Sequence, residues 1–293
     1  MGTRRPSLFR RAVLDPDHPI KPSPWGAVLF IGILTVLGLM TLIPLYWMVV
    51  TAFTPPTLAV RFPPELWPSS PTLRNFAAVL SRPMFVQWVI NSTIMAVVVT
   101  VFTVLTASMA GYAFAKIPFA GSKTLFWILI ISVMLPFETI LVPLFILITR
   151  MGLVDTYAGL ILPLLASPFG VFLMKQFIQT LPSELMDSAR VDGANEWQIF
   201  WHVVTPLVTS GMAFLGIITF VAQWNLFLWP LVATRSSSMR TLQVGLVLMR
   251  EEEPMYFGLH MASAALAAIP IIIVFFAFQR YFLRGITVGA VKG

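Results

Sequence analysis

The sequence predicts an all-α protein that crosses a membrane six times and carries a helical loop on one membrane face. Of its 293 residues, 58% are hydrophobic and 11% are charged, against about 45–50% and about 25% in an ordinary soluble domain. Six apolar runs are long enough to cross a hydrocarbon core, which takes about 20 residues. None shows the alternation of a membrane barrel strand, so each must satisfy its backbone as a helix.

The six runs lie at 26–53, 87–115, 124–148, 157–177, 205–233 and 259–282. We expect a membrane domain over 26–282, preceded by a basic cytoplasmic arm at 1–25 and followed by a short cytoplasmic tail at 283–293. The first run is too long for the apolar part of a signal peptide and lacks a small-residue cleavage site after it. It is therefore expected to stay as a membrane anchor.

The distribution of positive charge predicts the orientation. With the N-terminus in the cytoplasm, the inner segments hold twelve of the nineteen lysines and arginines, and the outer segments hold seven. Short cytoplasmic segments are enriched in these residues, so both termini are expected inside a bacterial or archaeal cytoplasmic membrane. A basic arm can also bind nucleic acid, but directly before a span it favours an orientation signal. The absence of cysteine excludes disulfides, thiolate metal sites and cysteine nucleophiles.

Charged residues return between the fourth and fifth runs, in a loop at 179–206 that contains "MDSARVDGANEWQIFWHVVTP". Pro182 is tolerated in the first turn of a helix, where no N–H is needed. Glu184 and Asp187 suit the positive end of its dipole. Gly193 follows at the place where a left-handed residue ends a helix. The first half of the loop is therefore predicted to be one short helix.

A second short helix is predicted after Gly193. Asn195 and Gln198 have the spacing of a capping box. An apolar face follows at helical spacing, made of Trp197, Phe200, Trp201 and Val204. Pro206 marks a kink or the entry to the fifth run. The two helices together form what we call the elbow, residues 179–206.

The elbow can lie among lipid headgroups or dock on another protein. Anionic headgroups select lysine and arginine, yet the elbow carries more acidic than basic residues, namely Glu184, Asp187, Asp192 and Glu196 against Arg190 and His202. Small side chains at Ser188 and Ala189 allow another surface to approach closely. Binding of DNA by this helix pair is disfavoured because the acidic residues repel phosphate. The charges favour a protein partner.

The elbow resembles a motif of a known family. "SELMDSARVDGANEWQIFWHVVTPL" is similar to the cytoplasmic EAA loop of permease subunits in binding-protein-dependent ABC importers. The E-A-A triplet reads Asp187, Ser188 and Ala189, the glycine is Gly193, and the L-P dipeptide reads Thr205 and Pro206. Segments 151–163, 224–234 and 278–293 resemble the second permease subunit of maltose-type carbohydrate importers.

This resemblance implies the type I importer permease fold and a set of partners. A second permease subunit would form a heterodimer with this chain in the membrane, two ATPase subunits would bind ATP and magnesium, and an extracytoplasmic binding protein would deliver a carbohydrate. The chain itself would be no enzyme and would hold no cofactor, and it lacks the G-x-x-x-x-G-K-[ST] phosphate loop. The ATPase-coupling residues would be Glu184, Asp187, Ser188, Ala189, Arg190, Asp192 and Gly193.

The last residues are a further candidate contact. In the resembled subunit the tail reaches between the ATPases, which implies contacts from Gly289, Lys292 and Gly293. The alternative is a frayed chain end, the usual state of a terminus.

Polar residues within the apolar runs suggest a substrate pathway, because such groups are costly in lipid. The candidates are Asn91, Gln223, Trp224 and Asn225. Amides can bond sugar hydroxyls and an indole can cover a sugar ring, but amides also join helices and tryptophans favour membrane interfaces. Glu138 is equally compatible with a pathway acid, a packing residue and an interfacial group.

Two outer loops are long enough to touch a binding protein, at 54–86 and 235–258. The second holds "REEEP" at 250–254, and it is the better candidate because the resemblance implies a probing loop there. The acidic run itself is more typical of a solvated surface.

Three other functions remain. Glycerol 3-phosphate or a polyol can be the solute, since no residue distinguishes these from sugars. An ion-coupled secondary transporter would need acidic residues in the membrane, where only Glu138 is offered. A membrane enzyme is disfavoured because His18, His202 and His260 are scattered and no H-E-x-x-H occurs.

Overall fold

The structure, a computed structural model, describes residues 24–55 and 66–290, with the side chains of the last helix described as far as Gln279. All the regular elements within these ranges are helical. In chain order they are α2 (Pro24–Phe53), α3 (Arg74–Leu80), α4 (Pro83–Lys116), α5 (Ser122–Val133), α6 (Phe137–Arg150), α7 (Tyr157–Ile161), η1 (Leu162–Leu164), α8 (Pro168–Gln179), α9 (Glu184–Val191), α10 (Glu196–Ile199), η2 (Phe200–Val204), α11 (Thr205–Leu207), α12 (Thr209–Trp224), α13 (Leu228–Ala233), α14 (Leu242–Glu252) and α15 (Phe257–Ala290).

Three of the predicted spans are single helices. α2, α4 and α15 each contain a stretch long and apolar enough to cross a membrane. They correspond to the predicted runs 26–53, 87–115 and 259–282. The backbone of α15 continues as a helix to Ala290, so it runs past the predicted end of the span at residue 282 and takes in most of the predicted tail. The predicted arm at 1–25 lies almost wholly outside the described residues.

The other three predicted spans are bent. α5 and α6 meet at 99°, the α7–η1 segment and α8 at 44°, and the α10–α11 segment and α12 at 79°. Counting each bent pair as one span gives six in total, as predicted. Each bend lies at or within two residues of a proline, namely Pro136, Pro168 and Pro206, which cannot donate to a helical carbonyl. The fifth run also stops at Trp224 and resumes as α13, so the single helix expected over 205–233 is wrong.

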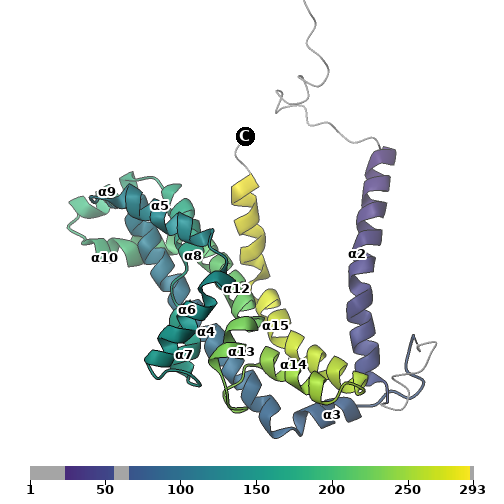
Figure 1. Cartoon of the computed structure of the whole chain (residues 1–293). Coiled ribbons are helices and arrows are strands. Elements are labelled where there is room, and N and C mark those ends of the chain that lie inside the picture. The colour runs from purple at the N-terminus through teal and green to yellow at the C-terminus, as the bar shows by residue number, and fades with distance from the viewer. Residues whose placement is uncertain (1–23, 56–65, 291–293) are drawn as a thin grey trace, which may run out of the picture.

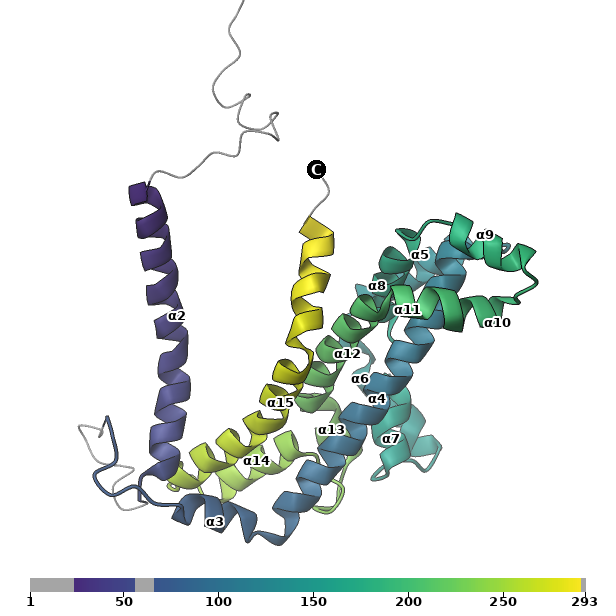
Figure 2. The same cartoon turned by 180° about the vertical axis from the view of Figure 1, so that it is seen from behind.

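α4 is the axis of the arrangement (Figure 1). α8 and α12 pack along it, and the elbow formed by α9 to α11 lies at its C-terminal end, whereas α3 and α14 lie near its N-terminal end. α2 stands apart along most of its length and approaches α3 and α15 near its C-terminus. Figure 2 shows from behind that the start of α2 and the end of α15 point toward the end of the molecule that holds the elbow. The start of α2 and the end of α15 therefore lie on the same side of the molecule as the elbow, as predicted. That this side faces the cytoplasm stays a prediction.

Buried side chains gather at both ends of this axis. One cluster joins α4, α8 and the elbow, and it includes Tyr112, Met174 and Phe200. Two others pack the opposite end around Trp88, Trp224 and Trp229. The first half of α2 exposes its apolar side chains, as expected for a helix that faces lipid or another membrane helix.

Candidate functional site

The elbow is built from two short helices joined by a left-handed turn. α9 ends in a Schellman motif, in which the N–H of Gly193 bonds Arg190 O at 3.0 Å and the N–H of Ala194 bonds Ala189 O at 2.9 Å. Gly193 has a φ of +86°, a conformation that glycine adopts without steric cost. The prediction that this glycine ends the first helix is confirmed.

The second helix begins with the predicted capping box. The Asn195 side chain accepts from the N–H of Gln198, and the Gln198 side chain accepts from the N–H of Asn195, both at 2.9 Å. Both caps follow from the local sequence. Pro182 differs from expectation, because α9 begins at Glu184 and the proline precedes the helix instead of lying in its first turn.

The predicted apolar face of the second helix is only partly correct. Phe200 and Val204 are buried, together with Ile199, whereas Trp197 and Trp201 keep 57% and 36% of their surface exposed. A π-helical turn covers Phe200–Val204 and holds more residues than an α-turn, so the α-helical spacing does not continue through it. Trp197 precedes this turn and is exposed on α10.

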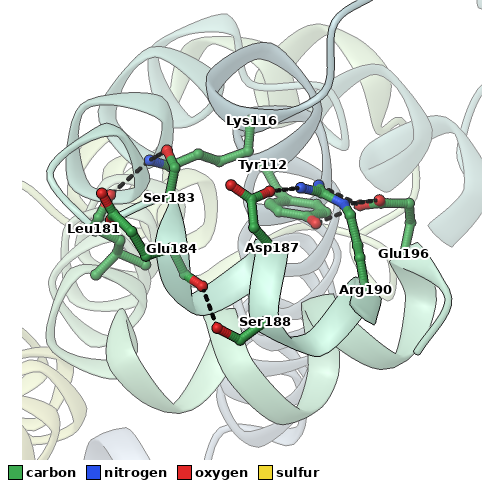
Figure 3. A network of polar contacts seen from close by, with 9 residues as sticks. All are labelled: Tyr112, Lys116, Leu181, Ser183, Glu184, Asp187, Ser188, Arg190 and Glu196. Atoms are coloured by element: carbon green, nitrogen blue, oxygen red, sulfur yellow. Dashed lines mark hydrogen bonds and ion pairs between the residues drawn. The ribbon is translucent and has the colours of Figure 1, made fainter. Parts of the chain in front are cut away.

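A charged network ties the two elbow helices together (Figure 3). The Arg190 guanidinium donates to Asp187 Oδ1 at 2.7 Å and to Glu196 Oε1 at 2.8 Å. The bond to Glu196 is the main cause that raises the pKa of Arg190 above its ordinary value, against the opposing effect of burial. Arg190 therefore stays charged at any physiological pH and links α9 to α10.

Two side chains of α4 attach the elbow to the bundle. The Tyr112 hydroxyl donates to Glu196 Oε2 at 2.5 Å. One turn later, the Lys116 ammonium donates to Leu181 O at 2.6 Å and to Ser183 Oγ at 3.2 Å. Tyr112 and Lys116 are four residues apart and so lie on one face of α4. Both ends of α9 are thus bonded, directly or through Arg190 and Glu196, to the same helix.

The attachment has an apolar layer beneath it. Met186 of α9 is 1% exposed, and Phe200 lies with its ring centroid 5.9 Å from that of Tyr112. The outer surface is different, because Val191 is 88% exposed and the Asp187 side chain is 66% exposed. The elbow is therefore held firmly from behind and presents an open charged face, on which Val191 is the most exposed of several apolar side chains.

The structure brings together on α9 and its C-terminal turn every residue predicted for coupling: Glu184, Asp187, Ser188, Ala189, Arg190, Asp192 and Gly193. Sequence reasoning missed Tyr112, Lys116 and the bonding role of Glu196. A signal existed in "GYAFAK" at the end of the second run, where a tyrosine and a lysine four apart close an apolar helix. Beside Gly193 lies a hollow of about 340 Å³, lined by Asp192, Gly193, Ala194, Gln198, Ile199, His202 and Val203.

Two of the predicted pathway residues are structural in this conformation. Asn91 is fully buried and donates to Ser238 O and Arg240 O, while its oxygen accepts from Tyr157 and Gln87. Its amide therefore has no group left for a solute. Trp224 is 1% exposed and donates to Ala267 O, so its indole does not face an open path either.

The other two lie at the C-terminal end of α12. Asn225 is exposed and its Oδ1 accepts from Gln243 at 3.5 Å, while the Oε1 of half-buried Gln223 is buried without a partner. Asn225 is the exposed amide at this end of α12, and its Nδ2 also donates to Val221 O at 2.9 Å, while Gln223 keeps one carbonyl oxygen unbonded. Glu138 is exposed in the first turn of α6, where a negative charge suits the helix dipole; its role stays open.

A second bonded centre, the outer staple, lies at the end of the bundle away from the elbow. Asp155 has a left-handed φ of +64°, and its Oδ1 accepts from the N–H of Arg235 and from the N–H and hydroxyl of Ser236, at 2.9 to 3.0 Å. Burial alone would raise the pKa of Asp155, but these bonds outweigh it and hold the pKa below its ordinary value. The carboxylate pins the segment that leads to α14.

The outer staple should weaken in acid. A lowered folded pKa means that the stabilisation is complete above the unfolded value and is lost as the pH falls below about 4. The chain has no cysteine, so a spin label can be placed on a cysteine introduced at exposed Ser238. We expect an immobile label at pH 7 that becomes mobile below about pH 4. Asp155→Asn tolerates the same backbone and should weaken the attachment of the loop by about 1–2 kcal/mol. The label should then already be mobile at pH 7, and its mobility should no longer change in acid. If the label in that variant still became mobile only below about pH 4, Asp155 would not be the group that holds the loop.

The remaining site predictions rest on other parts of the chain. Gly289 lies in the helical backbone of α15, while Lys292 and Gly293 lie outside the described residues. Within 24–55 and 66–290, no group of three or more histidine or acidic side chains is placed to hold a metal ion.

Residues 103–288 match the family model described as "Binding-protein-dependent transport system inner membrane component". The chain is 38% identical to the arabinooligosaccharides transport system permease protein AraQ of Halalkalibacterium halodurans, over 85% of this chain and 91% of the relative. It is 33% identical to the sn-glycerol-3-phosphate transport system permease protein UgpE of Yersinia pestis, over 89% and 96%. It is 32% identical to the lactose transport system permease protein LacG of Rhizobium radiobacter, over 89% and 94%.

A solved structure has the same fold. A chain in the crystal structure of a bacterial ABC transporter that imports the acidic polysaccharide alginate superposes with a TM-score of 0.80, at 22% identity, over 90% of this chain and all of that chain. The all-α permease fold predicted from the sequence is confirmed by this likeness. The matched region 103–288 includes the end of α4 and the whole elbow.

Proposed function

Because the chain belongs to the family of binding-protein-dependent transport system inner membrane components, we propose that it is a permease subunit of an ATP-driven importer whose solute is a carbohydrate. The single observation that carries this proposal is the elbow, a rigid and charged helix pair fixed to the end of a membrane-spanning helix. A separate ATPase that gripped it could move the bundle without any catalytic group in this chain. Two ATPase subunits, binding ATP and magnesium, would supply the energy.

We propose that the exposed face of α9 is the surface that docks on the ATPase. It carries the predicted coupling residues, and Asp187 and the neighbouring Val191 are both open to a partner. Apolar side chains in the centre of a contact and charges around it are typical of protein interfaces. The predicted tail contact through Gly289, Lys292 and Gly293 remains a proposal of the same kind.

On the opposite end we propose contact with a solute-binding protein through the loop 235–258, which includes α14. The outer staple fixes the start of this loop. Asn91 fixes it at two more points, so a docking protein would meet an ordered surface. A second permease subunit would complete the pathway in the membrane. In this proposal both chain termini lie in the cytoplasm.

The solute class follows from the relatives and from the amide group on α12. Relatives of this chain include permeases for arabino-oligosaccharides and lactose, and amides suit a hydroxyl-rich solute. Glycerol 3-phosphate is the second candidate because UgpE proteins are comparably similar. Titration of the cognate binding protein with each solute would decide between them.

Asn225→Leu should weaken solute handling, since it removes an exposed amide at the end of α12. We expect the apparent KM for uptake to rise about tenfold, the effect of losing one hydrogen bond in a partly desolvated site. Asn225→Gln, which keeps the amide, should show a smaller rise. Initial uptake rates in proteoliposomes at several solute concentrations measure this, and an unchanged KM in Asn225→Leu would remove Asn225 from the pathway.

The function itself is tested by reconstitution. Proteoliposomes containing this chain, its partner permease and the ATPase should accumulate solute only when ATP and the binding protein are present. Accumulation driven by an ion gradient in vesicles without the ATPase would instead identify a secondary transporter. A complex that forms without this chain's elbow touching the ATPase would also refute the proposal.

A further inference from the structure

α4 is bonded to a different functional segment at each of its ends. We propose that α4 transmits movement between the loop at 235–241 and the elbow, and that Asn91 and Tyr112 are the positioning residues at its two ends. The inference rests on the proposed function, because it assumes that a binding protein acts on the outer loop and an ATPase on the elbow. The inference adds that α4 is the element that joins the loop to the elbow, and it names the side chains that bond α4 to each of them.

The outer joint is formed by little more than one turn of α4. Asn91 Nδ2 donates to Ser238 O at 2.7 Å and to Arg240 O at 2.8 Å. Trp88 Nε1 donates to Ser237 O, and Ser92 Oγ accepts from the N–H of Leu242, the first residue of α14, both at 2.8 Å. Because these bonds engage the loop backbone, a shift of the loop must move α4 or break several buried bonds at once.

The inner joint is formed by Tyr112 and Lys116, the last turn of the same helix. Tyr112 holds Glu196 of the second elbow helix, and Lys116 holds Leu181 and Ser183 before the first. Arg190 then bonds Glu196 to Asp187, so the elbow follows α4 as one body. Only two side chains, Glu196 and Arg190, therefore lie between Tyr112 of α4 and Asp187 on the surface proposed for the ATPase.

α4 is suited to this task because it is unbroken. It contains 34 residues, and its proline stands at the first position, where it disturbs no hydrogen bond. At about 1.5 Å per residue, Asn91 and Tyr112 are roughly 30 Å apart along one continuous hydrogen-bonded helix. Each bent pair, by contrast, interrupts its path by 44° to 99°, and α15 carries Pro270 inside the helix. A bend absorbs movement that a straight helix passes on.

The experiment uses the complete complex in lipid vesicles, with the partner permease, the ATPase and the binding protein. Three quantities are measured for each variant: ATP hydrolysis without the binding protein, its stimulation by the loaded binding protein, and uptake. Tyr112→Phe removes only the hydroxyl at the inner joint. Asn91→Leu removes the two bonds of Asn91 to the loop at similar volume, and Ser92→Ala removes one bond of the outer joint should Asn91→Leu fail to assemble.

We expect Tyr112→Phe and the outer variant each to keep hydrolysis without the binding protein and to lose stimulation and uptake about tenfold, within the range of allosteric couplings. Since both break the same path, the double variant should be no worse than the stronger single one, as residues acting in one unit are not additive. The matched control is Tyr157→Phe, whose hydroxyl bonds Asn91 from α7 without joining either segment. It should keep stimulation close to that of the unaltered complex, because its bond leads to neither segment.

Three results would overturn the inference: losses that multiply in the double variant, a Tyr157→Phe variant as impaired as Tyr112→Phe, or full stimulation in Tyr112→Phe. These failures are distinguishable from failure of the proposed function, in which the unaltered complex itself would show neither ATP-driven uptake nor stimulation by the binding protein. Thermal melting of each complex separates loss of transmission from loss of structure, because only the latter lowers the melting temperature.

Discussion

Gly193→Asp should uncouple ATP hydrolysis from solute uptake and leave the helix bundle folded. The φ of +86° at this position strains a side chain with a Cβ by up to roughly 1–2 kcal/mol, and aspartate and asparagine less than the others. A Cβ would meet no atom within 4 Å, so the substitution does not disturb packing. The new carboxylate would stand beside Asp192 at the hollow next to the elbow. We expect uptake to fall about a hundredfold while the ATPase still hydrolyses ATP, because the added negative charge acts on the docking surface, together with a smaller effect of strain in the turn.

Two further variants separate those effects. Gly193→Asn tolerates the left-handed turn and adds no charge, so it should retain most of the uptake. Gly193→Val adds strain without charge, because a branched side chain is least compatible with this φ, and it should fall between the two. Measuring solute uptake and ATP hydrolysis in proteoliposomes ranks the three Gly193 variants. Normal uptake by Gly193→Asp would count heavily against the elbow as the coupling element.

The elbow could be predicted from sequence because its caps obey local rules. A glycine after a short polar helix and an Asn-x-x-Gln pair each act over three or four residues, and both appear as predicted. The apolar runs were equally readable, since length and composition decide whether a helix can cross lipid. Predictions of this kind need no knowledge of what the segment packs against.

The joints of α4 could not be predicted in the same way. Tyr112 and Glu196 are 84 positions apart, and Asn91 and Arg240 are 149 apart, so only the packed fold brings them together. The sequence presents Asn91 as a polar residue in lipid, which is compatible with either a pathway or a structural bond. Which side chains of the second elbow helix are buried depends on packing against α4 and α8, which periodicity does not reveal. Local pattern gives the elements here, and tertiary contacts decide what their polar residues do.

Gly111→Ala should destabilise the protein more than its single added methyl group suggests. A Cβ at Gly111 would lie 2.8 Å from Lys175 N and 2.9 Å from Met174 Cβ. The first neighbour is backbone and the second belongs to a fully buried residue, so neither can move without separating α4 from α8. Overpacking of this kind costs about 1–3 kcal/mol. We expect the melting temperature in detergent to fall by about 5 °C.

Uptake should fall with it, because Gly111 precedes Tyr112 and lies where α8 approaches the helix that holds the elbow. The matched control is Gly216→Ala in α12, where the nearest atom to a new Cβ is Val104 Cγ2 at an ordinary 3.6 Å. Alanine is the better helix former by roughly 1 kcal/mol, so this control should melt at the same temperature or higher. If both variants melted alike, the close approach of α4 and α8 would not be what fixes the elbow end of the bundle.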